Sequence, residues 1–132
     1  ELGKAGFGVF QLPCPEFTAY GAGRWGQTKD QYENPYYLMH CSRLADFVAA
    51  QVGIISAADT QGPVIGIDGS PSCDAGMTCR GPWGGEFRDA HAAKTLFAAV
   101  EFVREPGVFL QILQECAGFA NVRFVGVLEE RA

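Results

Sequence analysis

Three short apolar runs alternate with amphipathic segments along this chain, and this alternation limits the fold more than any other feature. The runs cover residues 6–12, 64–68 and 122–128, and each contains β-branched or aromatic residues typical of buried strands. The order strand, helix, strand, helix, strand favours parallel strands joined by right-handed crossovers. We therefore expect an α/β fold, specifically a three-layer Rossmann-like domain with a mainly parallel sheet and helices on both faces.

The longest amphipathic segment follows the dipeptide Asn34-Pro35. This dipeptide predicts a helix start, because Asn caps helices and Pro fits the first helical position. Apolar residues then recur at steps of four, three, four and four, which predicts one buried stripe on a helix ending near Gly53. The stripe comprises Tyr37, Cys41, Leu44, Val48 and Val52.

Two further helices are expected between the second and third runs. One covers residues 90–103, and the other begins at Pro106 and ends near Gly118. Residues 17–33 and 69–85 are rich in Gly and aromatic residues and are expected to be loops.

Length and composition narrow the class of protein. A chain of 132 residues with 48% hydrophobic residues is long enough for one domain, 1–132, and too apolar for a disordered tail. A net charge of −5 argues against nucleic acid as a partner. No unbroken apolar run reaches ~18 residues and no signal peptide is visible, so we expect no membrane association. Five cysteines, an odd number, favour a reducing cytoplasm.

Two cysteines lie in stiff turns directly after the first two apolar runs. Cys14 stands between Pro13 and Pro15, and Cys73 follows Ser70-Pro71-Ser72. Because the carboxyl ends of parallel strands meet at one edge of a sheet, we expect these segments to converge. Preorganised thiols suit metal ligation, and the alternative is two small residues packed at the sheet edge.

Polar side chains accompany both cysteines. Glu16 is a candidate proton acceptor beside a metal, or else a surface carboxylate or a partner for Arg24. Asp68 ends the second run, where it would orient a loop amide or contact a ligand. Ser70 and Ser72 offer hydroxyls for a site, or alternatively for capping the turn.

The remaining cysteines and histidines carry weaker signals. Cys79 is a candidate ligand, bystander or redox partner, whereas Cys41 and Cys116 are expected in the core. His40 and His91 have no Asp or Ser at a recognisable spacing, so a catalytic triad is not supported. No phosphate-binding Gly loop followed by Lys is present either.

Residues 11–16 and 66–73 resemble the CPE and SPSC signatures of TudS-type thiouracil desulfidases and their short, single-domain relatives. Residues 24–26, 83–86 and 107–109 are also similar to the short relatives. The resemblance implies a cytoplasmic enzyme with a 4Fe–4S cluster held by three cysteines. It also implies that the fourth iron is open to the sulfur of the substrate.

Two of the three family cysteines match Cys14 and Cys73. The third belongs to an N-terminal motif, with a strand and a helix, that has no counterpart in this sequence. Either that motif is missing from this chain, or this member has lost the cluster. Cys79 is a weak candidate to replace the third cysteine. Asp74 stands where the family has Gly, and would add negative charge near the cluster.

The resemblance implies removal of sulfur, as sulfide, from a small thiolated compound such as thiouracil. Glu16 would activate the attacking water, with Ser70 as a second catalytic residue, while Asp68, Ser72 and Trp83 would bind substrate. Possible aromatic walls are Phe17, Tyr20, Trp25 and Trp83. One alternative is a cluster-free α/β ligand-binding or interaction module, and another is a metal-free hydrolase or transferase with Cys14 as nucleophile. A homodimer is left open.

Overall fold

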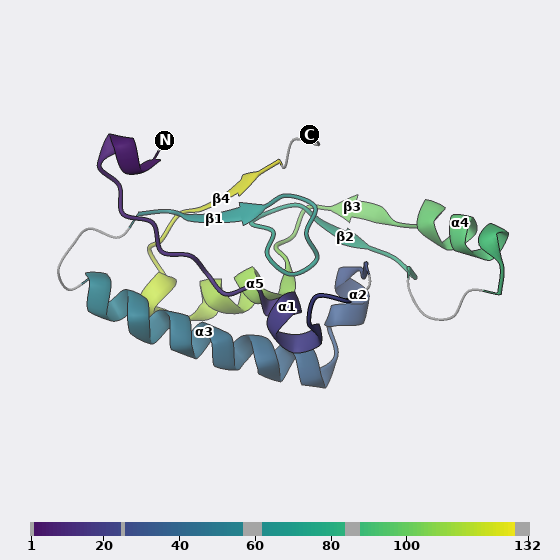
Figure 1. The fold of residues 1–132 in the computed structure, drawn as a ribbon, viewed down its shortest axis with the longest axis horizontal. Helices are drawn as coiled ribbons and strands as arrows, with labels where there is room; N and C mark the ends of the chain where they lie inside the picture. The colour runs from purple at the N-terminus through teal and green to yellow at the C-terminus, as the bar shows by residue number, and fades with distance from the viewer. Residues whose placement is uncertain (1, 25, 57–61, 84–87, 129–132) are drawn as a thin grey trace.

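The computed structural model describes residues 2–24, 26–56, 62–83 and 88–128 (Figure 1). The α-helices are α1 (Pro15–Tyr20), α2 (Lys29–Tyr32), α3 (Pro35–Ser56), α4 (Ala90–Ala98) and α5 (Val108–Glu115). The strands are β1 (Val64–Ile67), β2 (Thr78–Arg80), β3 (Glu101–Val103) and β4 (Phe124–Val127). Two short 3-10 turns, η1 (Leu2–Ala5) and η2 (Ala117–Phe119), complete the described elements.

The strands form two small sheets. β1 and β4 are parallel, with Val64 opposite Phe124 and Ile67 opposite Val127. β2 and β3 are antiparallel and lead away from the first sheet towards α4 at the far end of the molecule (Figure 1). The predicted mixed α/β class is confirmed, as are strands within residues 64–68 and 122–128.

The hydrophobic core lies between the β1–β4 sheet and α3, with α5 in the middle (Figure 1). The predicted stripe on α3 is confirmed, because its residues are buried or packed against the core, and α3 contacts α5. From α5 and η2 the core receives Val108, Phe109, Leu110, Leu113 and Phe119. Burying these side chains removes most of the apolar surface of α5 from water, which stabilises the layer.

Helix α3 begins where the sequence indicates. The Asn34 side chain accepts a hydrogen bond from the Tyr37 amide at 3.0 Å, which caps the helix. By length and composition alone, Pro35–Ile55 is apolar enough to cross a membrane, with a mean hydropathy of 1.2. Core helices of soluble proteins meet the same criterion, so this is weak evidence. Polar residues interrupt this segment, so it contains no unbroken apolar run of membrane-spanning length.

One face of the β1–β4 sheet carries no helix within the described residues. Ile65, Ile67 and Val127 are 50%, 43% and 43% exposed on the side opposite α5. The structure therefore shows an α/β layer with helices on one side, and the expected three layers are not seen in the described part.

The expected buried strand over residues 6–12 is wrong. Residues 7–14 form neither helix nor strand, and Phe7 and Val9 are 63% and 69% exposed. An apolar run becomes a strand only where another strand satisfies its backbone groups, and no described strand pairs with this one.

Several element boundaries also differ from expectation. The expected loops contain α2, most of α1 and all of β2. The helix expected over residues 90–103 ends at Ala98, because residues 101–103 pair with β2 instead. α5 starts at Val108 and not at Pro106, since Gly107 takes the extended cap position.

A buried lysine holds the turn that precedes α5. The Lys29 side chain is 1% exposed, and its Nζ donates to Glu105 Oε2 at 3.0 Å, to the Pro106 carbonyl at 2.8 Å and to Gln111 Oε1 at 2.8 Å. All three ammonium protons therefore have acceptors, which is the condition for burying a charge at tolerable cost.

Arg80 extends this network to the surface. Its guanidinium hydrogen-bonds both carboxylate oxygens of Glu105, and it also pairs with Asp30 at 2.8 Å and with Glu33 at 2.9 Å. The network ties α2, β2 and the residue 104–107 turn to one another. Hydrogen bonds to Glu105 and Glu33 raise the pKa of Arg80. The pKa of Asp30 is lowered, mainly by the hydrogen bond from the Gly81 amide and then by Arg80.

Glu105 is expected to make stability depend on pH. Hydrogen bonds from Arg80, and then from Lys29, lower the pKa of Glu105 from 4.5 to about 2. Its contribution is therefore complete above pH 4.5 and is lost as pH falls through 2. The free energy of unfolding of Glu105→Gln, measured with urea, should fall less steeply than that of the wild type between pH 4.5 and 2. Glu115→Gln, which changes an exposed carboxylate of α5, should keep the wild-type profile, and an unchanged profile in both variants would contradict the prediction.

Candidate functional site

Cys14 lies at the N-terminus of α1. Its backbone is extended and its Sγ accepts the Phe17 amide at 3.4 Å, so the thiol caps the helix. Pro15 occupies the first helical position and is buried, and Glu16 follows it in the first turn. The placement of Cys14 at a strand end was therefore wrong: a short helix, and not a strand, orients the Cys-Pro-Glu segment.

Asp74 organises the second cysteine loop. Its side chain is fully buried, and its carboxylate accepts hydrogen bonds from the amides of Gly69, Gly76 and Met77. Three amide donors compensate a buried carboxylate, so this residue closes the loop between β1 and β2. The negative charge of Asp74, which stands where the resembled family has Gly, is thus compensated within the loop itself.

The same loop rests on the N-terminus of α5. The Val108 amide donates to the Pro71 carbonyl at 3.0 Å, and the Phe109 amide donates to the Ser72 carbonyl at 2.8 Å. These amides are among those that a helix N-terminus leaves unpaired, so loop and helix satisfy each other. At Gly107, a Cβ would lie 2.5 Å from the Ser72 carbonyl carbon.

The two cysteine segments converge as predicted. Ser72 Oγ donates to Glu16 Oε1 at 2.5 Å across 56 positions of sequence, and Arg24 Nε donates to Glu16 Oε2 at 3.0 Å. The partnership of Glu16 with Arg24, one of the interpretations of this carboxylate, is confirmed. Each carboxylate oxygen has a donor, so Glu16 is fixed in orientation.

Cys73 is half-buried beside this pair. Its Sγ donates to Ser70 Oγ at 3.1 Å, and Ser70 Oγ also accepts the Cys73 amide at 3.2 Å. The Ser70 hydroxyl therefore shapes the turn, as its capping alternative proposed. Burial raises the pKa of the Cys73 thiol, and Glu16 and Cys14 add to this effect, which places Cys14 within electrostatic reach of Cys73.

Two tyrosines that sequence reasoning did not assign to the site lie beside Glu16 and Ser72. Tyr32 and Tyr37 are both fully buried, with ring centroids 4.4 Å apart. Tyr20 stacks on Tyr37 at 5.7 Å. Burial raises the pKa of both phenols; the carboxylate of Glu16 adds to it at both, and Cys41 does so more strongly at Tyr37. In the sequence, the apolar stripe of α3 predicted the burial of Tyr37 but not where its hydroxyl lies, and no pattern singled out Tyr32 of α2.

The other two predicted substrate-binding residues, Asp68 and Trp83, contact β4 and α4. The Asp68 carboxylate fills the space that a Cβ at Gly126 would take, so it packs across β4. Trp83 lies edge-on to Phe97 of α4, with centroids 5.3 Å apart. Trp25 falls outside the described residues, and of the other proposed aromatic walls only Tyr20 joins the tyrosine cluster.

The other cysteines and histidines divide between core and surface. Cys41 is fully buried, which raises its pKa to about 12, and Cys116 packs against the core, as expected for both. Cys79 is half-buried in β2. His91 is exposed in the first turn of α4, and His40 Nε2 lies 2.8 Å from Thr18 Oγ1, a companion that the sequence spacing did not reveal.

These residues do not complete a metal site by themselves. Across residues 2–24, 26–56, 62–83 and 88–128, no three His, Cys, Asp or Glu side chains are arranged to hold a metal ion. Cys14 and Cys73 match two of the three family cysteines by sequence, and Cys79 forms no three-residue metal-holding group with them in the described part of the chain.

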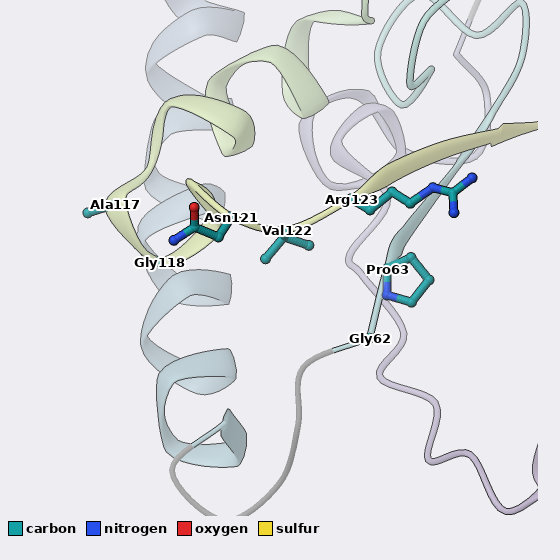
Figure 2. Close-up of a pocket in the computed structure, with 7 residues that line it drawn as sticks. All are labelled: Gly62, Pro63, Ala117, Gly118, Asn121, Val122 and Arg123. Atoms are coloured by element: carbon teal, nitrogen blue, oxygen red, sulfur yellow. The ribbon is translucent and has the colours of Figure 1, made fainter.

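A separate hollow of about 540 Å³ lies at the opposite end of the sheet (Figure 2). It is lined by residues preceding β1 and β4, including Pro63, Asn121 and Arg123. Because the cysteine loop follows β1, this hollow is not part of the Glu16–Ser72 site.

Comparison with known proteins adds little to this geometry. No protein-family profile matches the chain, and no solved structure matches it. One relative is "Uncharacterized protein MJ0003" of Methanocaldococcus jannaschii, which is 32% identical over 71 residues. These residues are 54% of this chain and 46% of that protein, so the chain spans less than half the length of the relative that it matches.

Proposed function

We propose that this chain forms the carboxylate-bearing part of a cytoplasmic desulfidase that acts on a small, thiouracil-like compound. The reaction is a hydrolysis in which a thiocarbonyl and water give a carbonyl and hydrogen sulfide. The observation that supports it best is the Ser72–Glu16 hydrogen bond, because it joins the two cysteine segments around one oriented carboxylate. The residues of both signatures thereby share one site.

Glu16 acts as the proton acceptor in this proposal. Ser72 and Arg24 fix the two carboxylate oxygens, and a free lone pair takes a proton from water. The water oxygen bonds to the carbon of the thiocarbonyl as the carbon–sulfur double bond opens to a single bond. That single bond then breaks, and sulfide leaves as hydrogen sulfide with the proton from Glu16 and the hydroxyl proton of the adduct, which becomes the carbonyl. No oxidant or reductant is consumed. In this proposal Ser70, in the turn beside Cys73, is the second catalytic residue. Asp68, Ser72 and Trp83 are the proposed substrate-binding residues.

Cys14 and Cys73 would hold a 4Fe–4S cluster together with a ligand from outside the described residues. When bound, such a cluster supplies an iron with an open position for the soft sulfur of the substrate. The three-layer form of the fold belongs to the same proposal, and it requires a covering layer over Ile65, Ile67 and Val127.

Cys73→Ser is expected to abolish iron retention and sulfide release, whereas Cys116→Ser leaves both near wild type. Cys73 lies in the converged site, and Cys116 packs against the core, so the pair separates ligation from general thiol loss. The measurements are the iron and acid-labile sulfide content after anaerobic reconstitution, the visible absorbance of an iron–sulfur cluster, and the sulfide released from 2- or 4-thiouracil. Equal iron content in the two variants would remove Cys73 from the ligand set.

One observation favours a second candidate function, a cluster-free ligand-binding or interaction module. Among the described residues no three Cys, His, Asp or Glu side chains are arranged to hold a metal ion, whereas the cluster implied by the resemblance takes three cysteines. Reconstituted protein that carries no iron, yet binds thiouracil in calorimetry, would support the module over the enzyme.

A further inference from the structure

The hydroxyl groups of Tyr32 and Tyr37 lack hydrogen-bond partners within the described part of the chain. Both oxygens are buried, and neither makes a hydrogen bond of normal geometry. Glu16 nevertheless lies near enough to shift the pKa of Tyr32 through hydrogen bonding, and Ser72 does the same at Tyr37, which in turn shifts the pKa of Cys41. A buried hydroxyl without a partner is costly, and two such groups beside one carboxylate indicate a shared polar ligand.

The chemistry of these groups selects the ligand. Two phenol hydroxyls donate, whereas the Glu16 carboxylate accepts, so the ligand must both accept and donate. An anion would be repelled by Glu16, and a larger molecule would not reach oxygens that are closed to solvent. Water is small and both donates and accepts hydrogen bonds, and buried waters typically bridge two to four otherwise unsatisfied polar groups.

We propose that Tyr32 and Tyr37 hold one internal water molecule against Glu16 and Ser72. Under the proposed function, on which this role rests, the molecule is the water of hydrolysis and both tyrosines are positioning residues. They keep its oxygen near the converged loops while Glu16 accepts its proton. The existence of the water site itself does not depend on the desulfidase reaction.

Tyr32→Phe and Tyr37→Phe test the water site through the sign of their effect on stability. If a hydroxyl holds water, its removal leaves the other groups unsatisfied and raises the unfolding equilibrium constant about fivefold. If a hydroxyl has no partner, its removal relieves a cost and the constant stays unchanged or falls, which would overturn the proposal. Tyr36→Phe is the control, because Tyr36 is 52% exposed and its hydroxyl reaches only the Ala19 carbonyl at 3.5 Å. It should leave the constant unchanged.

A crystal structure of the full chain provides the second measurement. We expect an ordered water within about 3.2 Å of both phenol oxygens and of Glu16, and its loss in Tyr37→Phe. Direct Tyr32–Glu16 and Tyr37–Ser72 hydrogen bonds with no water between them would overturn the proposal.

Kinetics separate this inference from the proposed function. With thiouracil, both Phe variants should lose kcat by about tenfold or more with little change in KM, because they misplace water and not substrate. A wild-type chain that releases no sulfide, yet shows the ordered water and the stability effects, refutes the desulfidase while the water site stands. An active chain whose Phe variants keep full kcat refutes the positioning role.

Discussion

Lys29→Ala should destabilise the chain by about 3 kcal/mol or more. The substitution leaves the Pro106 carbonyl and the Gln111 side chain without their buried donor, and it removes one of two cations from Glu105. It also opens a space among fully buried residues. Breaking a buried ion pair from one side costs more than the pair contributes, because the remaining groups stay desolvated.

The measurement for Lys29→Ala is the midpoint of urea unfolding at neutral pH. Lys94→Ala, which shortens an exposed lysine on α4, is the matched control and should change the free energy of unfolding by less than about 0.5 kcal/mol. A loss below about 1 kcal/mol in Lys29→Ala would show that solvent reaches the acceptors of Lys29.

Gly107→Ala should disrupt the site as well as the fold. The added Cβ would lie 2.5 Å from the Ser72 carbonyl carbon and 2.9 Å from the Asp74 amide nitrogen, so loop backbone has to move. Overpacking of this kind costs about 1–3 kcal/mol. Because Ser72 carries the hydrogen bond to Glu16, we expect this shift of the loop to break that bond. Any sulfide release should then fall more than about tenfold, because a small misplacement of a catalytic group lowers the reaction rate strongly.

Gly118→Ala is the control for Gly107→Ala. A Cβ at Gly118 meets nothing within 4 Å, so stability and site geometry should stay close to wild type. Thermal unfolding measures the first effect, and amide chemical shifts of residues 70–74 measure the second. Unperturbed loop shifts in Gly107→Ala would show that α5 moves away from the loop instead.

The sequence predicts best the elements whose signals are local. Asn34 marked the start of α3, and the apolar stripe identified its buried face, because capping and helical periodicity act within a few residues. The run at residues 6–12 failed because a strand needs a partner elsewhere in the chain. The same cause explains β3, since pairing with β2 overrode the helical pattern at residues 101–103.

The convergence of the two cysteine segments was predicted for a partly wrong reason. The Ser70–Cys73 segment does follow a parallel strand, but Cys14 caps a helix. Arg24 could be proposed as a partner for Glu16 because it lies close in the sequence. The buried phenols could not, because a tyrosine in an apolar stripe, such as Tyr37, gives no sign of where its hydroxyl lies. Asp74 was likewise judged by its charge, and its three amide donors are visible only in the folded loop.

The seating of the Ser72 loop on α5 has a consequence for biosynthesis. Glu16 leaves the ribosome before the loop that supplies its partner, and that loop is braced by amides at residues 107–110. A nascent chain shorter than this has no support for that loop. The carboxylate therefore acquires its final surroundings only after residues 107–110 have been made. Its ordering carries the entropy cost of closing the long segments of chain between Glu16, the loop and these residues.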